Sequence, residues 1–92
     1  MARYYIYVLY SLKDNKFYTG FTEDLLSRIK QHTRGEVRST KDRLPLLLIH
    51  YEYFIDEKDA KAREVFLKSG FGRDQLRKSL QRTLTKLGTS NQ

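Results

Sequence analysis

Arg28 and His32 combine residue types that suit phosphate chemistry. They are four residues apart, a spacing that places two side chains on the same face of a helix. A guanidinium group offers a planar pair of donors to phosphate oxygens, and a histidine exchanges protons near neutral pH. This pair, close to a tyrosine-rich strand, is compatible with a phosphodiester site. The structural alternative is an arginine that extends along the edge of an apolar stripe and a hydrogen-bonded histidine.

Glu64 is a second candidate because it falls on a helical face that should be apolar. Helical spacing places it between Ala60, Leu67 and Phe71. An isolated carboxylate in such surroundings is costly, so it needs a partner. The partner is either a neighbouring basic side chain or a hard cation, since carboxylate oxygens suit Mg²⁺ or Mn²⁺.

The first third of the chain predicts two strands and a helix to position these residues. Residues 3–10 are β-branched and aromatic, which favours a strand. A polar turn then leads to a short return strand over 17–20. Gly20 ends that strand, or lets another group approach the backbone closely. Thr22 is the expected cap of a helix that runs to about Arg34.

The remainder predicts a loop, a strand and two helices. Residues 35–44 are polar and basic, which indicates a surface loop. Residues 46–54 form the most apolar run, which implies burial on both faces and therefore a central strand. One helix is expected over about 57–68, and a basic amphipathic helix over about 73–87. The order β-β-α-β-α-α predicts an α+β fold, a three-stranded antiparallel sheet flanked by helices.

The composition of the 92 residues excludes several classes of protein. There is no cysteine, which excludes a disulfide framework, a thiolate metal site and a cysteine protease. No apolar run approaches the roughly 18–20 residues of a membrane span, and the N-terminus lacks the layout of a signal peptide. We expect one cytoplasmic domain over residues 1–87, followed by a disordered tail over 88–92.

The charge of the chain favours a polyanionic partner. The formal net charge is +7. Residues 28–43 hold six basic and two acidic side chains, and residues 61–86 hold eight basic and two acidic ones. A small basic domain of this kind suggests nucleic acid, while the structural alternative is a solvated surface without a ligand.

The order of these features along the chain resembles the GIY-YIG nuclease superfamily. The matching segments are Tyr5-Ile6-Tyr7, Tyr18-Thr19-Gly20, Arg28 with His32, and Glu64. The resemblance covers roughly residues 3–80. It is greatest to small stand-alone bacterial members, which are related to the N-terminal nuclease domain of the incision protein of nucleotide-excision repair.

The resemblance implies roles for particular residues. The implied catalytic residues are Tyr7, Tyr18, Arg28 and His32, and the implied ligand of a single Mg²⁺ or Mn²⁺ ion is Glu64. Gly20 would allow a close approach of backbone or phosphate. Two basic groups would hold flanking phosphates: Arg34, Arg38, Lys41 and Arg43 in the loop, and Arg73, Arg77, Lys78 and Arg82 in the last helix. The implied activity is a metal-dependent DNA endonuclease, with structure-selective cleavage in repair or recombination as one form of it.

Two other classes of function stay open at this point. The family's late asparagine has no match after Glu64, which favours a nucleic-acid-binding module of the same fold with weak or no catalysis. A protein–protein adaptor with an incidental basic surface is the third alternative. Neither a membrane partner nor a small-molecule cofactor is expected.

Overall fold

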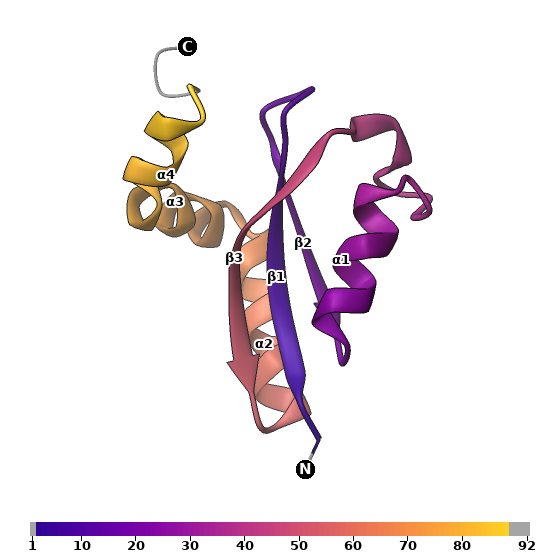
Figure 1. Cartoon of the computed structure of the whole chain (residues 1–92). Coiled ribbons are helices and arrows are strands. Elements are labelled where there is room, and N and C mark those ends of the chain that lie inside the picture. Colours follow the sequence, from indigo (N-terminus) through magenta and orange to yellow (C-terminus); the bar gives the residue numbers. More distant parts are fainter. Residues whose placement is uncertain (1, 89–92) are drawn as a thin grey trace.

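The computed structural model describes residues 2–88 and has an α+β fold, as the sequence predicts (Figure 1). Apart from Gly88, the expected tail lies outside the described residues. The strands are β1 (Tyr4–Ser11), β2 (Phe17–Thr22) and β3 (Leu46–Phe54). The helices are α1 (Leu25–Thr33), the short 3₁₀ helix η1 (Lys41–Arg43), α2 (Glu57–Lys68), α3 (Gly70–Ser79) and α4 (Gln81–Lys86). None of the helices in this part of the chain is long and apolar enough to cross a membrane.

The three strands form an antiparallel sheet in the order β2-β1-β3. The expectation that residues 46–54 form the central strand is therefore wrong, because β1 lies in the centre and β3 at an edge. Tyr51 and Tyr53 of β3 remain about half exposed. Most side chains of β3 are only partly buried or are exposed, whereas the side chains of β1 are buried on both faces from Ile6 onward.

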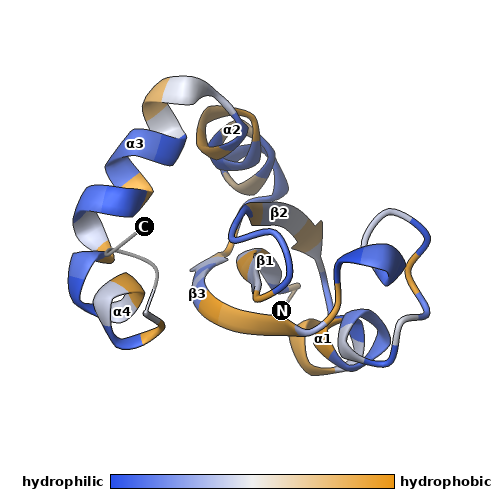
Figure 2. Ribbon diagram, turned by 90° about the horizontal axis from the view of Figure 1, so that it is seen from above, coloured by the Kyte–Doolittle hydropathy of each residue, from blue (hydrophilic) through white to orange (hydrophobic). Residues whose placement is uncertain are grey.

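Helices cover both faces of the sheet (Figure 2). α2 lies on one face, where Ile6 and Val8 pack against Ala60 and Leu67. α1 lies on the other face, in contact with the apolar cluster around Tyr7 and neighbouring strand residues. Alternate side chains of β1 therefore belong to two separate hydrophobic clusters, one on each face of the sheet. β2, at the edge opposite β3, is reached from both helix layers.

The start of α1 differs from the sequence prediction. Thr22 belongs to β2, and the N-cap is Asp24, whose carboxylate accepts a hydrogen bond from the Ser27 amide at 3.2 Å. The Thr22 hydroxyl instead accepts a hydrogen bond from the Asp24 amide at 3.1 Å and so holds the turn into the helix. Both residues are good caps, and the extra length of the return strand decides between them.

Two further segments differ from their predictions. The basic helix expected over 73–87 is two helices, α3 and α4, which are separated at Leu80. The segment 35–44 is not only a surface loop, since it contains η1 and buries Val37 and Thr40. Polar composition alone gave no indication that a threonine in this segment lies in the interior.

Candidate active site

The ring of Tyr7 crosses the backbone of the neighbouring strand at Gly20. The two residues are paired in the register of β1 and β2. A Cβ atom placed on Gly20 would lie 2.4 Å from Cζ and from the hydroxyl oxygen of Tyr7, which is too close for any side chain. The sequence reasoning expected a close approach at Gly20, and the group that approaches is the phenol of Tyr7.

The Tyr7 hydroxyl begins a buried chain of hydrogen bonds. It lies 2.7 Å from Nε2 of His32, and Nδ1 of His32 lies 2.7 Å from the hydroxyl of Thr40. Tyr7 is 1% exposed, and His32 and Thr40 are 0% exposed. In one tautomer Tyr7 donates to Nε2 while Nδ1–H donates to Thr40; in the other, both donors are reversed. Either way the imidazole is held by both ring nitrogens.

Burial sets the protonation of this chain. It lowers the pKa of His32 to about 4, and the positive charge of Arg28 adds to the decrease. The imidazole is therefore neutral near pH 7 and retains one nitrogen lone pair. Burial likewise raises the pKa of Tyr7, while the Arg28 guanidinium acts in the opposite direction. The phenol is a neutral hydroxyl in the free protein.

Arg28 and Tyr18 surround the same hydroxyl group. α1 turns Arg28 toward Tyr7, and Gln31 accepts a hydrogen bond from Nη1 of Arg28 at 2.9 Å. The Tyr18 ring centroid is 5.1 Å from that of His32 and 6.4 Å from that of Tyr7. The predicted quartet of Tyr7, Tyr18, Arg28 and His32 is therefore brought together from two strands and one helix.

Glu64 lies on α2, on the opposite face of the sheet from α1, and its charge acts on Tyr7. α2 packs against β1 and β2, and the negative charge of Glu64 contributes to the raised pKa of Tyr7. Its side chain is 17% exposed and pairs with the more exposed Lys68 at 2.9 Å. Ala60 and Leu67 are buried beside it as expected, but Phe71 lies beyond the end of α2 and is exposed, contrary to the expected stripe.

One carboxylate at a solvent-facing edge fits a hydrated Mg²⁺ or Mn²⁺ ion. No group of three His, Cys, Asp or Glu side chains suited to a metal occurs within residues 2–88. Mg²⁺ does not need such a group, because it keeps several waters and binds through one or two carboxylates together with substrate phosphates. Glu64 is paired with Lys68, whose side chain is 55% exposed and can turn away, so its oxygens are accessible to an ion.

The basic residues expected to hold phosphates separate into two kinds. Most of them are exposed: Arg34, Arg38 and Lys41 after α1, Arg73, Arg77 and Lys78 on α3, and Arg82 on α4. Arg43 differs because its Nε donates to Asp14 at 2.7 Å, and its Nη2 lies 3.3 Å from the carbonyl oxygens of Lys16 and Phe17. That guanidinium is engaged in holding the β1–β2 hairpin.

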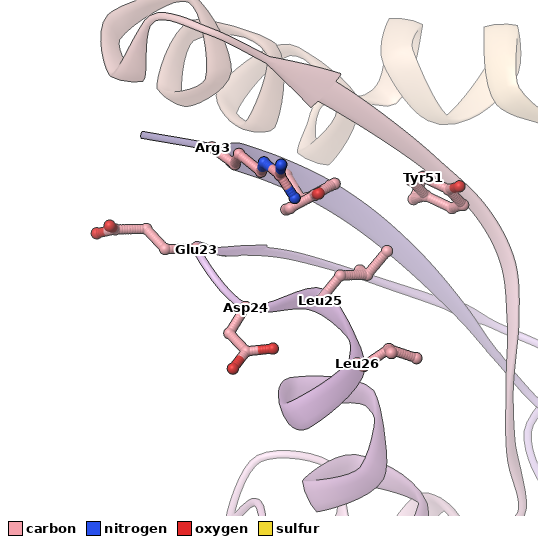
Figure 3. Close-up of a pocket in the computed structure, with 7 residues that line it drawn as sticks. Arg3, Glu23, Asp24, Leu25, Leu26 and Tyr51 are labelled. Carbon is pink, nitrogen blue, oxygen red and sulfur yellow. The ribbon is translucent and has the colours of Figure 1, made fainter. Parts of the chain in front are cut away.

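A separate hollow lies at the start of α1 and does not include the tyrosine–histidine chain (Figure 3). Its lining residues are Arg3, Tyr5, Glu23, Asp24, Leu25, Leu26 and Tyr51. The two carboxylates oppose a polyanion at this place. The hollow is therefore a poor candidate for holding phosphates.

Thr40 and Gln31 are the parts of the site that the sequence reasoning missed. Gln31 had a local signal, since it is three residues after Arg28 on the same helix. Thr40 had none, because its contact with His32 depends on how the segment after α1 folds back. Ser39, whose hydroxyl lies 3.5 Å from the Tyr18 hydroxyl, likewise had no local signal in the sequence.

The chain is similar to known proteins over most of its length. Residues 3–78 match the GIY-YIG catalytic domain. A UPF0213 protein of Staphylococcus haemolyticus is 37% identical over 82 residues, which cover 88% of this chain and 98% of that protein. A UPF0213 protein of Clostridium perfringens is 38% identical over 65 residues, 70% of this chain and 69% of that protein.

A solved structure shows the same similarity. The solution NMR structure of a UPF0213 protein from Bacillus halodurans has a TM-score of 0.52 and 34% identity, and the match covers 80% of this chain and 81% of that one. The GIY-YIG domain implies a nuclease-like fold, and its nucleases typically use a divalent metal. The chain therefore belongs to the GIY-YIG family, and its similarity extends over most of its length to the small UPF0213 proteins.

Proposed function

We propose that the protein is a divalent-metal-dependent endonuclease that hydrolyses phosphodiester bonds in DNA. One observation carries this proposal. The buried Tyr7 hydroxyl is bonded to a neutral His32, with the Arg28 guanidinium beside it and the Glu64 carboxylate approaching from the other face. A phosphodiester needs a proton acceptor, a cation for the phosphoryl oxygens and an anchor for a metal ion, and these groups meet here.

Glu64 would hold the metal ion. When bound, the ion supplies positive charge that neutralises the phosphoryl oxygens and offsets the carboxylate charge felt by Tyr7. Lys68 would release the carboxylate and turn to solvent, since its side chain is more exposed than that of Glu64. The metal ion would then replace the Lys68 ammonium as the cation beside this mostly buried carboxylate.

Other residues of the chain would bind the phosphoryl group, transfer the proton and orient the water. Arg28 binds the phosphoryl group and gains interaction energy as negative charge develops on it. Tyr7 accepts a proton from the attacking water and transfers its own proton to Nε2 of His32, which Thr40 holds in position through Nδ1. As the water oxygen bonds to phosphorus, the bond from phosphorus to the leaving oxygen breaks, and that oxygen takes a proton from solvent. Tyr18, whose ring lies against His32, orients the water.

The test is nicking of supercoiled plasmid in Mg²⁺ or Mn²⁺. We expect Tyr7→Phe to lower the rate by about 10²–10⁴-fold, the usual contribution of a positioned proton acceptor, and Glu64→Gln to abolish the stimulation by metal, because the carboxylate would anchor the ion. Tyr51→Phe is the matched control, because Tyr51 pairs with Tyr7 in the sheet register but is half exposed. It should nick at the rate of the unmodified protein. Equal nicking by Tyr7→Phe and the unmodified protein would contradict the proposed role of Tyr7.

We also expect substrate preference to depend on DNA structure more than on sequence. Contacts from exposed arginines and lysines to phosphates carry no sequence information. Such selectivity suits nicked or branched DNA of the kind that arises in repair and recombination. Cleavage of branched and plain duplex oligonucleotides of the same sequences tests this point, and equal rates would contradict it.

A nucleic-acid-binding module is the second candidate function. The observation in its favour is that Glu64 is paired with Lys68 and belongs to no group of three acidic, histidine or cysteine side chains suited to a metal among residues 2–88. This candidate predicts salt-dependent DNA binding without metal-stimulated cleavage. Cleavage that is lost in Glu64→Gln would exclude it.

A further inference from the structure

Basic side chains of α2 and α3 lie against the two phenylalanine rings of β2. The ammonium group of Lys61 lies 3.9 Å from the ring centroid of Phe21, and the guanidinium of Arg77 lies 4.7 Å from that of Phe17. These two contacts mark the two ends of β2. Gly20 lies between Phe17 and Phe21 along the strand, so β2 connects the candidate active site with the turn of the hairpin.

A hollow of about 370 Å³ lies at the hairpin end of β2. Its lining residues are Lys16, Phe17, Arg73 and Arg77. Nη1 of Arg73 donates to the carbonyl of Lys68 at 2.8 Å, and Arg77 is held against the face of Phe17. Both guanidinium groups are thus held in position while other N–H donors remain free.

The cations of this hollow lack acidic partners. Within residues 2–88, no ion pair involves Lys16, Arg73 or Arg77. Asp14, the acidic residue nearest to Lys16 in the turn, is engaged by Arg43. Three positive charges around one hollow repel one another unless an anion joins them. The hollow at the start of α1 has the same volume but includes two carboxylates, whereas no acidic residue lines this one.

The position of the hollow indicates what the anion is. From Lys16, directly before β2, to Gly20 within it the chain advances four residues, roughly 13 Å at about 3.3 Å per residue. Successive phosphates of a nucleic-acid strand lie several ångströms apart, so this separation spans only a few nucleotides. A strand whose scissile phosphate lies at Tyr7 and Glu64 would bring a later phosphate to Lys16, Arg73 and Arg77.

We propose that the hollow formed by Lys16, Arg73 and Arg77 binds a backbone phosphate of the nucleic acid, a few nucleotides from the bond beside Glu64. This inference rests on the proposed function for the identity of the substrate, but the hollow acts in binding and not in the chemical step. It fixes where the strand lies along β2, and therefore which bond reaches Tyr7.

The experiment measures DNA binding in the absence of metal, so that cleavage does not enter the result. Lys16→Glu places a carboxylate within reach of Arg73 and Arg77 in place of the phosphate. We expect the dissociation constant for a duplex oligonucleotide to rise by about tenfold or more, and the slope of log K against log salt to become shallower by about one. The melting temperature should not fall, because the new carboxylate relieves the repulsion.

Lys58→Glu is the matched control, because Lys58 is exposed near the start of α2 and does not line the hollow. It makes the same change in net charge. We expect it to weaken binding much less than Lys16→Glu. An equal loss of binding in the two variants would overturn the proposal, since it would show that only the total charge matters. Unchanged binding by Lys16→Glu would overturn it as well.

Two further measurements distinguish a nucleic-acid phosphate from a free phosphate ion, and this inference from the proposed nuclease activity. Titration with inorganic phosphate, followed by amide NMR shifts of Phe17 and Arg73, tests for a free anion. Saturation at low phosphate with DNA binding unaffected by Lys16→Glu would assign the hollow to free phosphate and overturn the proposal. Nicking assays on Glu64→Gln test the nuclease separately. DNA binding that depends on Lys16 in a protein without cleavage would support this inference while the proposed function fails.

Discussion

The contact between Tyr7 and Gly20 shows that a missing methyl group decides the geometry of the candidate site. The phenol reaches His32 by passing over a backbone that has no Cβ atom. Any side chain at position 20 must displace the ring, and the ring is fully buried, so it has no free space to move into.

We therefore expect Gly20→Ala to lower the free energy of unfolding by about 1–3 kcal/mol, the usual cost of overpacking a buried site. It should also remove most DNA nicking, because Tyr7 would lose its contact with His32. Urea unfolding and the plasmid assay measure the two effects. Gly70→Ala is the control, since a Cβ atom there meets nothing within 4 Å, and it should be at least as stable as the unmodified protein. A Gly20→Ala variant with normal stability and normal nicking would disprove this account of the site.

At the scale of secondary-structure elements, Arg43 connects η1 to the β1–β2 hairpin. Its guanidinium binds Asp14 and two hairpin carbonyls, and the Ser11 hydroxyl donates to the Arg43 carbonyl at 2.6 Å. The hydrogen bond from Arg43 holds the pKa of Asp14 below its usual value. The same segment carries Thr40, so this connection also supports the partner of His32.

Arg43→Gln should destabilise the fold by about 1–2 kcal/mol, because it breaks a partly exposed ion pair and leaves hairpin carbonyls without a donor. Arg38→Gln removes an equal charge from an exposed position and should change stability by less than about 0.5 kcal/mol. Thermal or urea unfolding of the two variants checks this difference. If Arg38→Gln proves as destabilising as Arg43→Gln, the structural role of Arg43 is wrong.

At the scale of the whole molecule, folding buries a histidine that the unfolded chain exposes to water. The pKa of His32 falls from 6.5 to about 4 on folding. Below about pH 6.5 the unfolded state binds a proton that the folded state does not. The free energy of unfolding therefore decreases as the pH is lowered from about 6.5 to about 4. Between about pH 7 and about pH 5 this difference amounts to about 2 kcal/mol.

Urea unfolding at several pH values in this window measures the effect. His32→Gln should show a flatter dependence on pH, while His50 is present in both proteins and so leaves the comparison unaffected. Carboxylates contribute little above about pH 5, because their ordinary pKa values lie near about 4. Identical pH slopes for His32→Gln and the unmodified protein would contradict the burial of a neutral His32.

The sequence by itself determined what depends on neighbours along the chain. The bounds of α2, the shared helical face of Arg28 and His32, and the strand character of β1 all follow from local periodicity and residue type. These features are short-range, because a helix or strand repeats within a few residues. The family resemblance rested on the same local motifs, and its fold was confirmed.

Only the tertiary structure decided which distant groups meet. β1 is central and β3 is at the edge because pairing in a sheet is a long-range choice that an apolar run does not specify. Three contacts join segments that are separated along the chain by a turn or by whole secondary-structure elements. They are Thr40 with His32, Arg43 with Asp14, and Lys16 with Arg73 and Arg77. No spacing along the chain encodes such contacts, since they arise when packing brings remote residues to one place.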